Sequence, residues 1–296
     1  MNSNKGKVGV IGLGIMGGAF ARNLATAGWQ VTGYDIDKSR CDDVSVAGIQ
    51  IAADPADVAQ SVPTIITSLP KPAALHDISN DLASSKAKTL RVVEASTFAL
   101  EDKLTAERIL SKAGHIALDC PVSGTGAQAK TKDLVIYASG DSASIRALRP
   151  LFADFSRATY DLGVFGNGSR MKYVANLLVS IHNVATAEAF VLGMKAGLDP
   201  RQIQEVISSG AGNSRIFELR GPMMVKNDYR EATMRISTWQ KDVQVINAFA
   251  RELGCPTPTF DATLPIYEQA LAEGRGDEDT ASVCSTLETM AGFQRG

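Results

Sequence analysis

Three glycines near the N-terminus have a spacing that suits phosphate binding. They form the pattern G-x-G-x-x-G, after the apolar run 8–11 and before an apolar repeat of helical period. In such a turn the first glycine permits a tight bend, the second lets the backbone approach a pyrophosphate, and the third lets the helix pack closely on the strand. The alternative is a glycine-rich turn with a purely structural role. The residues expected to contact a dinucleotide are Gly12, Leu13, Gly14, Ile15, Met16 and Gly17.

An acid follows this turn at the distance that a ribose requires. Asp35 closes the expected second strand, residues 29–34, and its carboxylate suits the two hydroxyls of an adenosine ribose. A carboxylate at this place repels a 2′-phosphate, so we expect NAD to be favoured and NADP to bind less well. Lys38 and Arg40 follow closely in the sequence and can weaken that preference.

A lysine and an asparagine lie one turn apart on a long predicted helix. The i, i+4 spacing of Lys172 and Asn176 places both on one face, apart from the apolar stripe of the same helix. Burial and a neighbouring cofactor lower the pKa of a lysine, so Lys172 can act as general acid and base while Asn176 orients it or the substrate. A solvated surface lysine is the more common alternative for this residue type.

Two further segments carry polar groups of the kind that hold anions. Residues 119–126 follow an expected strand, and the hydroxyls and amides of Ser123, Gly124 and Thr125 can bind a carboxylate. Lys241 is a second cation on a predicted helix. The alternatives are a polar turn and an ordinary surface charge.

Alternating strands and helices must position these residues in the first half of the chain. This alternation predicts an α/β fold with a Rossmann-type, doubly wound parallel sheet, which binds ligands at the carboxyl ends of its strands. The expected strands are residues 8–11, 29–34, 64–69, 89–95, 115–118, 134–138 and 158–160.

The pattern becomes helical after residues 166–168. Residues 169–196 predict one long helix, on which Met171, Val174, Leu178, Ile181 and Ala185 recur at steps of three and four. Further helices are expected at residues 200–208, 238–253 and 259–273. We therefore expect an NAD-binding domain at residues 1–165, and an all-α domain for substrate binding or oligomerisation at residues 166–296.

The composition excludes several classes of function. The chain has 296 residues, of which 45% are hydrophobic, and its net charge of −2 without a basic block gives nucleic-acid binding no electrostatic support. No signal peptide and no run of 18 apolar residues is visible, so we expect a cytoplasmic protein without a membrane partner. The four cysteines and three histidines are scattered, which predicts reduced thiols and no metal site.

Taken together, these segments resemble the β-hydroxyacid dehydrogenase family, which includes 3-hydroxyisobutyrate, tartronate-semialdehyde and L-threonate dehydrogenases. The resemblance covers nearly the whole chain. Its five segments, in order, are GLGIMGGAFARNL for the cofactor turn, DCPVSGTG for the substrate loop, GNGSRMKYVANLL for the catalytic helix, QKDVQV for the Lys-Asp motif and GRGDEDTASV for the C-terminal motif.

The resemblance implies a role for each candidate. Lys172 matches the catalytic lysine, Asn176 its partner, and Lys241 a lysine that contacts cofactor or substrate. Ser123, Gly124 and Thr125 match the substrate-binding loop, although the family usually has glycine where this chain has Thr125. The residues implied to line the path of the nicotinamide and its ribose are Leu69, Pro70 and Thr97.

The expected activity is hydride transfer between NAD and the carbinol carbon of a small hydroxy acid, with a homodimer or homotetramer as the assembly. The presence of Lys172 counts against the imine-reductase branch of the family, and the segment GAGNSRIFELRGPMM is similar to members acting on polyhydroxylated acids. Two alternatives stay open, an NADPH-dependent reductase of small aldehyde acids and an inactive nucleotide-binding protein.

Overall fold

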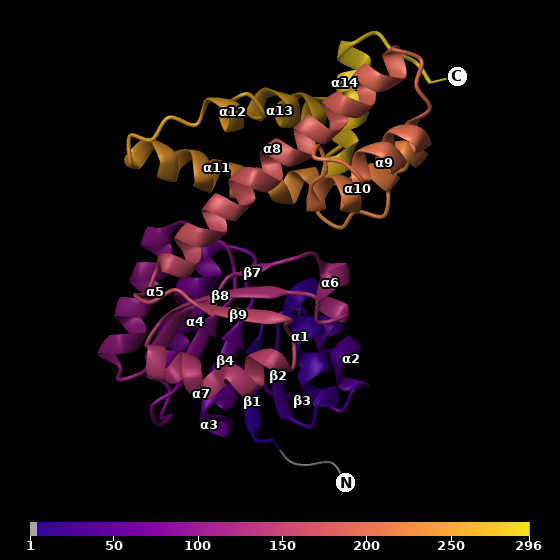
Figure 1. The fold of residues 1–296 in the computed structure, drawn as a ribbon. Helices are drawn as coiled ribbons and strands as arrows, with labels where there is room; N and C mark the ends of the chain where they lie inside the picture. The colour runs from indigo at the N-terminus through magenta and orange to yellow at the C-terminus, as the bar shows by residue number, and fades with distance from the viewer. Residues whose placement is uncertain (1–4, 296) are drawn as a thin grey trace. The chain divides into compact units, whose positions relative to one another are not determined.

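The computed structural model describes residues 5–295. Its internal contacts divide the chain into two compact units, one that ends at Lys172 and one that begins at Tyr173. The first unit is an α/β domain and the second is helical (Figure 1). The assignment of a substrate or oligomerisation role to the second unit stays a prediction.

The first unit is built on a nine-stranded sheet. The spatial order is β3-β2-β1-β4-β5-β6-β8-β7, with β9 beside β8. The Rossmann-type prediction is confirmed, and the sheet is mixed rather than wholly parallel because β8 runs antiparallel to β6 and β7. The strands are β1 (Lys7–Ile11), β2 (Gln30–Tyr34), β3 (Gln50–Ile51), β4 (Thr64–Thr67), β5 (Arg91–Glu94), β6 (Ile116–Asp119), β7 (Val122–Ser123), β8 (Val135–Gly140) and β9 (Ala158–Asp161).

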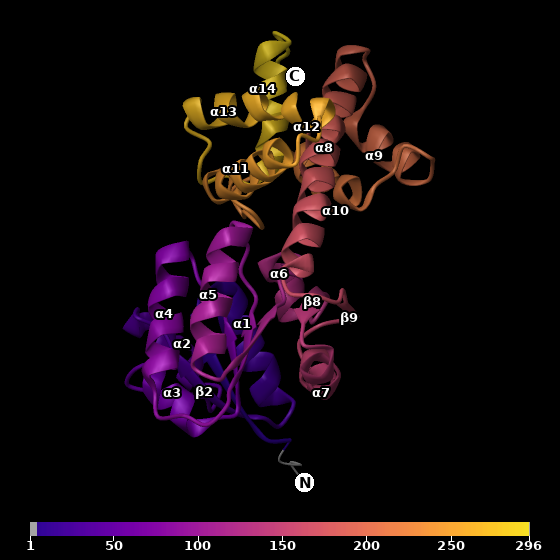
Figure 2. The same cartoon turned by 90° about the vertical axis from the view of Figure 1, so that its left-hand side faces the viewer.

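Helices cover both faces of this sheet, which is why β4 can be buried along its whole length. One apolar core contains Phe20, Val44 and Phe152 and lies under α1 (Ile15–Thr26), α2 (Lys38–Ser45), α6 (Gly126–Lys130) and α7 (Ser142–Ala153). A second core contains Val58 and Leu82 and lies under α3 (Pro55–Ser61), α4 (Pro72–Ser84) and α5 (Leu100–Lys112). Figure 2 shows α3, α4 and α5 side by side on their face.

The order of the strands places a ligand-binding position at the carboxyl ends of β1 and β4. The chain moves outward from β1 to β3 and then crosses to β4 on the other side of β1. At such a switch point the loops that follow the two strands diverge and leave room for a ligand. The glycine turn follows β1, and Leu69 follows β4.

The second unit packs its helices around the continuation of α8 (Asn167–Lys195). Its core includes Phe190, Phe217, Trp239 and Tyr267. The remaining elements are α9 (Pro200–Ser208), α10 (Arg215–Lys226), α11 (Ile236–Glu252), α12 (Pro258–Asp261), α13 (Leu264–Ala272), the 3₁₀ turn η1 (Thr280–Ser282) and α14 (Val283–Met290). The all-α prediction is confirmed, whereas α10, α14 and the short strands β3 and β7 were not expected.

The helix expected at residues 259–273 is wrong as a single element. It is divided into α12 and α13, and a proline stands in the first turn of each. Pro265 has no backbone N–H and its ring clashes with a preceding turn, so the helix starts afresh there instead of continuing from α12.

The long helix α8 is confirmed, but the apolar stripe expected on it faces outward along its N-terminal half. Met171, Val174 and Leu178 are 41%, 54% and 47% exposed, whereas Lys172 and Asn176 are 8% and 4% exposed. By length and composition α8 is also the one helix among residues 5–295 that could cross a membrane, with a mean hydropathy of 1.5. Core helices of globular proteins pass the same test, and 44% of the apolar window is buried inside the protein.

Candidate active site

The glycine turn has the backbone that a pyrophosphate requires. Gly12 has a φ of +87°, and a Cβ at this position would overlap the carbonyl oxygen of Ser68. A Cβ at Gly17 would overlap the carbonyl oxygen of Gly12, so both positions admit only glycine. Gly14 instead has open space before it, with the Arg40 guanidinium 3.5 Å from the place of a Cβ. No side chain caps the start of α1, so its first amides suit an anionic group.

Asp35 is part of the turn as well as a candidate ribose acceptor. Its side chain is 4% exposed and accepts hydrogen bonds from the backbone N–H groups of Leu13, at 2.7 Å, and Asp37, at 2.9 Å. The Arg40 guanidinium lies 3.5 Å from the same carboxylate. Each carboxylate oxygen has two lone pairs, so acceptor capacity remains for a ribose hydroxyl. Arg40 thus supplies a cation beside the candidate ribose acceptor.

The loops expected to form the rest of the cofactor site converge around this turn. A Cβ at Gly12 would lie 3.3 Å from the Leu69 side chain, which places the loop after β4 against the glycine turn. The Leu69 N–H donates to the Ser96 hydroxyl at 2.8 Å, which joins that loop to the loop after β5. Thr97 follows Ser96 and is partly buried, whereas Pro70 is exposed.

The segment 119–126 is more ordered than a polar loop. It contains β7, and Thr125 caps α6 through a reciprocal pair of bonds with Gln128. The Thr125 hydroxyl accepts the Gln128 N–H, and its own amide donates to the Gln128 side chain at 3.0 Å. Gly124 has a φ of +136°, and a Cβ at Gly126 would overlap Ile15. The candidate substrate segment therefore packs against the glycine turn, with Thr125 already engaged.

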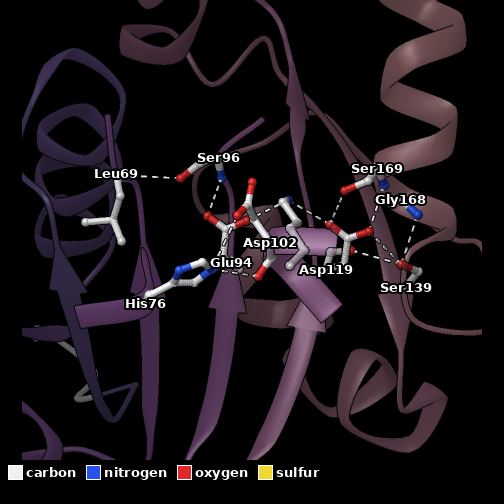
Figure 3. A network of polar contacts seen from close by, with 10 residues as sticks. Leu69, His76, Glu94, Ser96, Asp102, Asp119, Ser139, Gly168 and Ser169 are labelled. Atoms are coloured by element: carbon white, nitrogen blue, oxygen red, sulfur yellow. Dashed lines mark hydrogen bonds and ion pairs between the residues drawn. The ribbon is translucent and has the colours of Figure 1, made fainter. Parts of the chain in front are cut away.

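A buried charged cluster lies beside these loops and was missed from the sequence. The ammonium of Lys103 on α5 lies 2.5 Å from Glu94 Oε2 and 2.8 Å from Asp119 Oδ1. Figure 3 labels the two acids. Asp119 also accepts hydrogen bonds from the backbone N–H and the hydroxyl of Ser169, at 2.7 and 2.9 Å. We call Glu94, Lys103 and Asp119 the Lys103 cluster. The sequence contained one sign of this cluster, because Glu94 and Asp119 stand at the ends of two consecutive parallel strands.

The second unit holds its own group of candidate residues. The Asn176 amide donates to Asp242 Oδ2 at 3.0 Å, and the Lys241 ammonium lies 3.4 Å from Asp242 Oδ1. Asp242 is buried, while the side chain of Lys241 is 38% exposed. The structure thus joins Asn176 and Lys241 through Asp242, the acid of the Lys-Asp motif, to which the sequence argument assigned no role. A contact of Lys241 with cofactor or substrate stays a prediction.

Comparison with known proteins covers almost the whole chain. The model described as the NAD binding domain of 6-phosphogluconate dehydrogenase matches residues 7–165. The model described as NAD-binding of NADP-dependent 3-hydroxyisobutyrate dehydrogenase matches residues 166–287.

Curated relatives and solved structures agree with these models. L-threonate dehydrogenase of Haemophilus influenzae is 30% identical over 96% of this chain and 95% of its own length. Glyoxylate/succinic semialdehyde reductase 2 of Arabidopsis thaliana is 29% identical over 95% of this chain and 79% of its own length. The crystal structure of a 3-hydroxyisobutyrate dehydrogenase from Salmonella typhimurium superposes with a TM-score of 0.84 at 27% identity and covers 95% of this chain and 100% of that chain.

Proposed function

The chain belongs to the β-hydroxyacid dehydrogenase family, and from this premise we propose that it transfers a hydride between NAD and the carbinol carbon of a small hydroxy acid. The family makes it an NAD(P)-dependent oxidoreductase acting on hydroxyl groups. The substrate class that we propose is a sugar acid such as a threonate, or a 3-hydroxyisobutyrate-like acid. Lys172 is the proposed general acid and base.

The observation that carries this proposal is the burial of Lys172 and Asn176 on the N-terminal half of α8, where Met171, Val174 and Leu178 are exposed. A buried charge or amide costs free energy unless it has partners. An apolar side chain at either position would avoid that cost, and apolar side chains are available one residue away. A polar face that is kept inside in this way is typical of a functional site.

The proposed roles follow from the donors and acceptors. The cofactor, when bound, supplies the hydride chemistry. Lys172 accepts the proton of the substrate hydroxyl in oxidation and returns it in reduction. Because the Asn176 amide nitrogen donates to Asp242, its carbonyl oxygen is directed elsewhere as an acceptor, which suits a substrate hydroxyl or an ammonium group. Ser123 and the backbone at Gly124 are the proposed anchor for the substrate carboxylate, since the hydroxyl of Thr125 serves as a helix cap.

The preference for NAD is proposed from Asp35, whose carboxylate repels a 2′-phosphate. The second candidate is an NADPH-dependent reductase. One relative is named as a semialdehyde reductase, and the Arg40 cation beside Asp35 can offset the repulsion of a 2′-phosphate. Assembly as a homodimer or homotetramer is also proposed, with the exposed apolar side chains of α8 as available surface.

A cofactor and substrate screen tests the function. The purified protein is assayed by nicotinamide absorbance at alkaline pH with NAD or NADP and a panel of small hydroxy acids, each paired with its methyl ester. We expect turnover of the acids, a lower KM for NAD than for NADP, and poor turnover of the esters. A lower KM for NADP contradicts the cofactor proposal, equal turnover of acid and ester contradicts the carboxylate anchor, and binding of NADH without any turnover supports an inactive protein.

A further inference from the structure

The Lys103 cluster begins with two acids that the sheet forces together. Glu94 and Asp119 are the last residues of β5 and β6 and lie opposite each other in the parallel register. Neighbouring strands are about 4.8 Å apart, so the two buried carboxylates would repel each other without a cation. Lys103 reaches between them from α5 and supplies that cation.

Lys103 itself is unsuited to proton exchange with a substrate. Its side chain is 0% exposed. Burial lowers the pKa of this ammonium, but the charges of Asp119 and Glu94 outweigh that effect and hold the pKa above its ordinary value. The lysine therefore stays charged. One positive and two negative groups leave the cluster with a formal charge of −1.

The excess negative charge lies against the start of α8. Both oxygens of Asp119 bind Ser169, so this carboxylate caps the helix from another element and faces its positive end. Gly168 allows the close approach, because a Cβ there would lie 2.6 Å from the Asp119 carbonyl oxygen. Its N–H also donates to the Ser139 hydroxyl, which in turn donates to Asp119 (Figure 3).

The other acid connects the cluster to the candidate cofactor loops. Glu94 Oε1 accepts the Ser96 N–H at 2.9 Å, and the Ser96 hydroxyl accepts the Leu69 N–H. The cluster thus has two arms, one through Glu94 to the loops after β4 and β5, and one through Asp119 to the first turn of α8. Lys172 follows Ser169 by three residues and so lies one turn further along the same face.

We propose that Asp119, held in place by Lys103, is a positioning residue that fixes the first turn of α8 and acts on the reaction through Lys172. This inference rests on the proposed role of Lys172 as general acid and base. Proton transfer depends on a geometry that a displacement of about 1 Å can impair by about 100-fold. Glu94 contacts Ser96 and Lys103, whereas Asp119 binds Ser169 on α8, so the two acids are expected to differ in their effect.

The two acids offer a matched pair of isosteric variants. Asp119→Asn and Glu94→Gln each remove one negative charge, and each leaves Lys103 with one carboxylate. At saturating NAD we expect Asp119→Asn to lower kcat by about 10- to 100-fold. We expect Glu94→Gln, whose side chain contacts the cofactor loops, to act mainly on the KM for NAD and to lower kcat less than Asp119→Asn does. Binding of NADH, measured by fluorescence titration, is expected to stay within about threefold in Asp119→Asn.

A control on α5 separates positioning from loss of stability. Leu110 lies two turns beyond Lys103 on the same face and is 2% exposed. Leu110→Ala removes buried apolar side chain and should destabilise the unit, while all three members of the cluster keep their charges and hydrogen-bonding groups. Assayed well below its melting temperature, it is expected to keep its kcat. If Leu110→Ala and Asp119→Asn lower the melting temperature by the same amount and also lower kcat by the same factor, the proposal is overturned.

Amide hydrogen exchange gives a readout that does not depend on activity. In Asp119→Asn the Ser169 amide is expected to exchange at least about 10-fold faster, with no such change in Glu94→Gln. Equal exchange rates in the two variants overturn the positioning role even if Lys172 is catalytic. If Lys172→Ala keeps normal turnover, the proposed function fails, while the exchange experiment still decides the positioning role.

Two further variants complete the test. In a Lys172→Ala background, Asp119→Asn is expected to have no additional effect on the residual rate, because Asp119 acts through the lysine side chain that is missing. If Asp119→Asn lowers the rate as much in this background as in the unaltered protein, the proposal is contradicted. Should Asp119→Asn not fold, Ser169→Ala removes only the hydroxyl bond to Asp119. A kcat for that variant equal to the unaltered value then overturns the proposal, and a reduced kcat with unchanged NADH binding supports it.

Discussion

The two faces of α8 differ in a way that reverses the usual distribution of side chains. In the N-terminal half of the helix the buried face carries Lys172, Asn176 and Ser180, while Val174 and Leu178 are exposed. In the C-terminal half the buried face is apolar, as Phe190 illustrates. One helix therefore combines an ordinary core segment with a segment whose polar side is inside. We infer that hydrogen bonding helps to maintain the inverted half, beside the apolar burial of Tyr173.

The largest effect is expected at Lys172. Proton transfer by a positioned side chain contributes about 10²–10⁴-fold to rate, so Lys172→Ala should lower kcat by a factor in that range. The protein should still fold, because alanine is a good helix former, and should still bind NADH. Steady-state kinetics with a substrate found in the screen, together with NADH titration, measures this. A loss of NADH binding equal to the loss of rate would move Lys172 from catalysis to cofactor binding.

A stability effect is expected at Asn183, further along the buried face. Its amide donates to the Tyr267 hydroxyl and to the Thr280 carbonyl, both at 2.9 Å. Asn183→Ala leaves those acceptors unpaired, which costs about 1–3 kcal/mol in the free energy of unfolding. Urea denaturation measures the change, and kcat well below the midpoint should be unaltered. An unchanged midpoint would show that hydrogen bonds do not maintain the polar face.

A smaller effect is expected at Asp242. Asp242→Asn replaces a charged acceptor of the Asn176 amide by a neutral one of the same shape. Hydrogen bonds to charged groups contribute about 1 kcal/mol more than neutral ones, so Asn176 should be held less firmly and kcat should fall by roughly 5- to 10-fold. The comparison variant is Lys241→Met, which removes the exposed partner of Asp242. Because Lys241 is also a predicted contact of cofactor or substrate, we expect this variant to act mainly on KM and to alter kcat less. If the two variants change kcat alike, the cation and not the Asn176 contact is what matters.

The smallest effect is expected on the exposed apolar face. Val174→Ser and Leu178→Ser should each change the free energy of unfolding by about 1 kcal/mol or less, because about half of each side chain is already exposed. Thermal melts at several protein concentrations measure this. A larger, concentration-dependent loss would sharpen the comparison by showing that a second copy of the chain covers this face.

Much of the fold could be predicted because its signals are local. The bounds of α9 follow from Asp199 as cap and Pro200 in the first turn, and the sequence prediction of 200–208 matches them. The strands β1, β4 and β5 are short apolar runs with turn residues at their ends. The division between α12 and α13 was missed because the helical period runs through it, although Pro265 is a local sign of the interruption.

The candidate site could be predicted only in part. The glycine turn and the Lys172–Asn176 spacing are readable within a few residues. The face of α8 that lies inside cannot be read from the sequence. The periodicity shows which residues share a face, but tertiary contacts decide whether that face points inward or outward. The Lys103 cluster joins residues from three elements, and Lys103 alone resembles any helical lysine in the sequence. Its partners become visible only when the register pairs Glu94 with Asp119.

The pH dependence of kcat in the oxidation direction tests the central claim most directly. With Lys172 as the base, kcat of the unaltered protein rises with pH as the lysine loses its proton. We expect Lys172→Ala to lose both the rate and this dependence, and Lys172→Arg not to restore them, because a guanidinium stays protonated. A folded, NADH-binding Lys172→Ala protein with near-normal turnover and an unchanged pH profile would contradict the account.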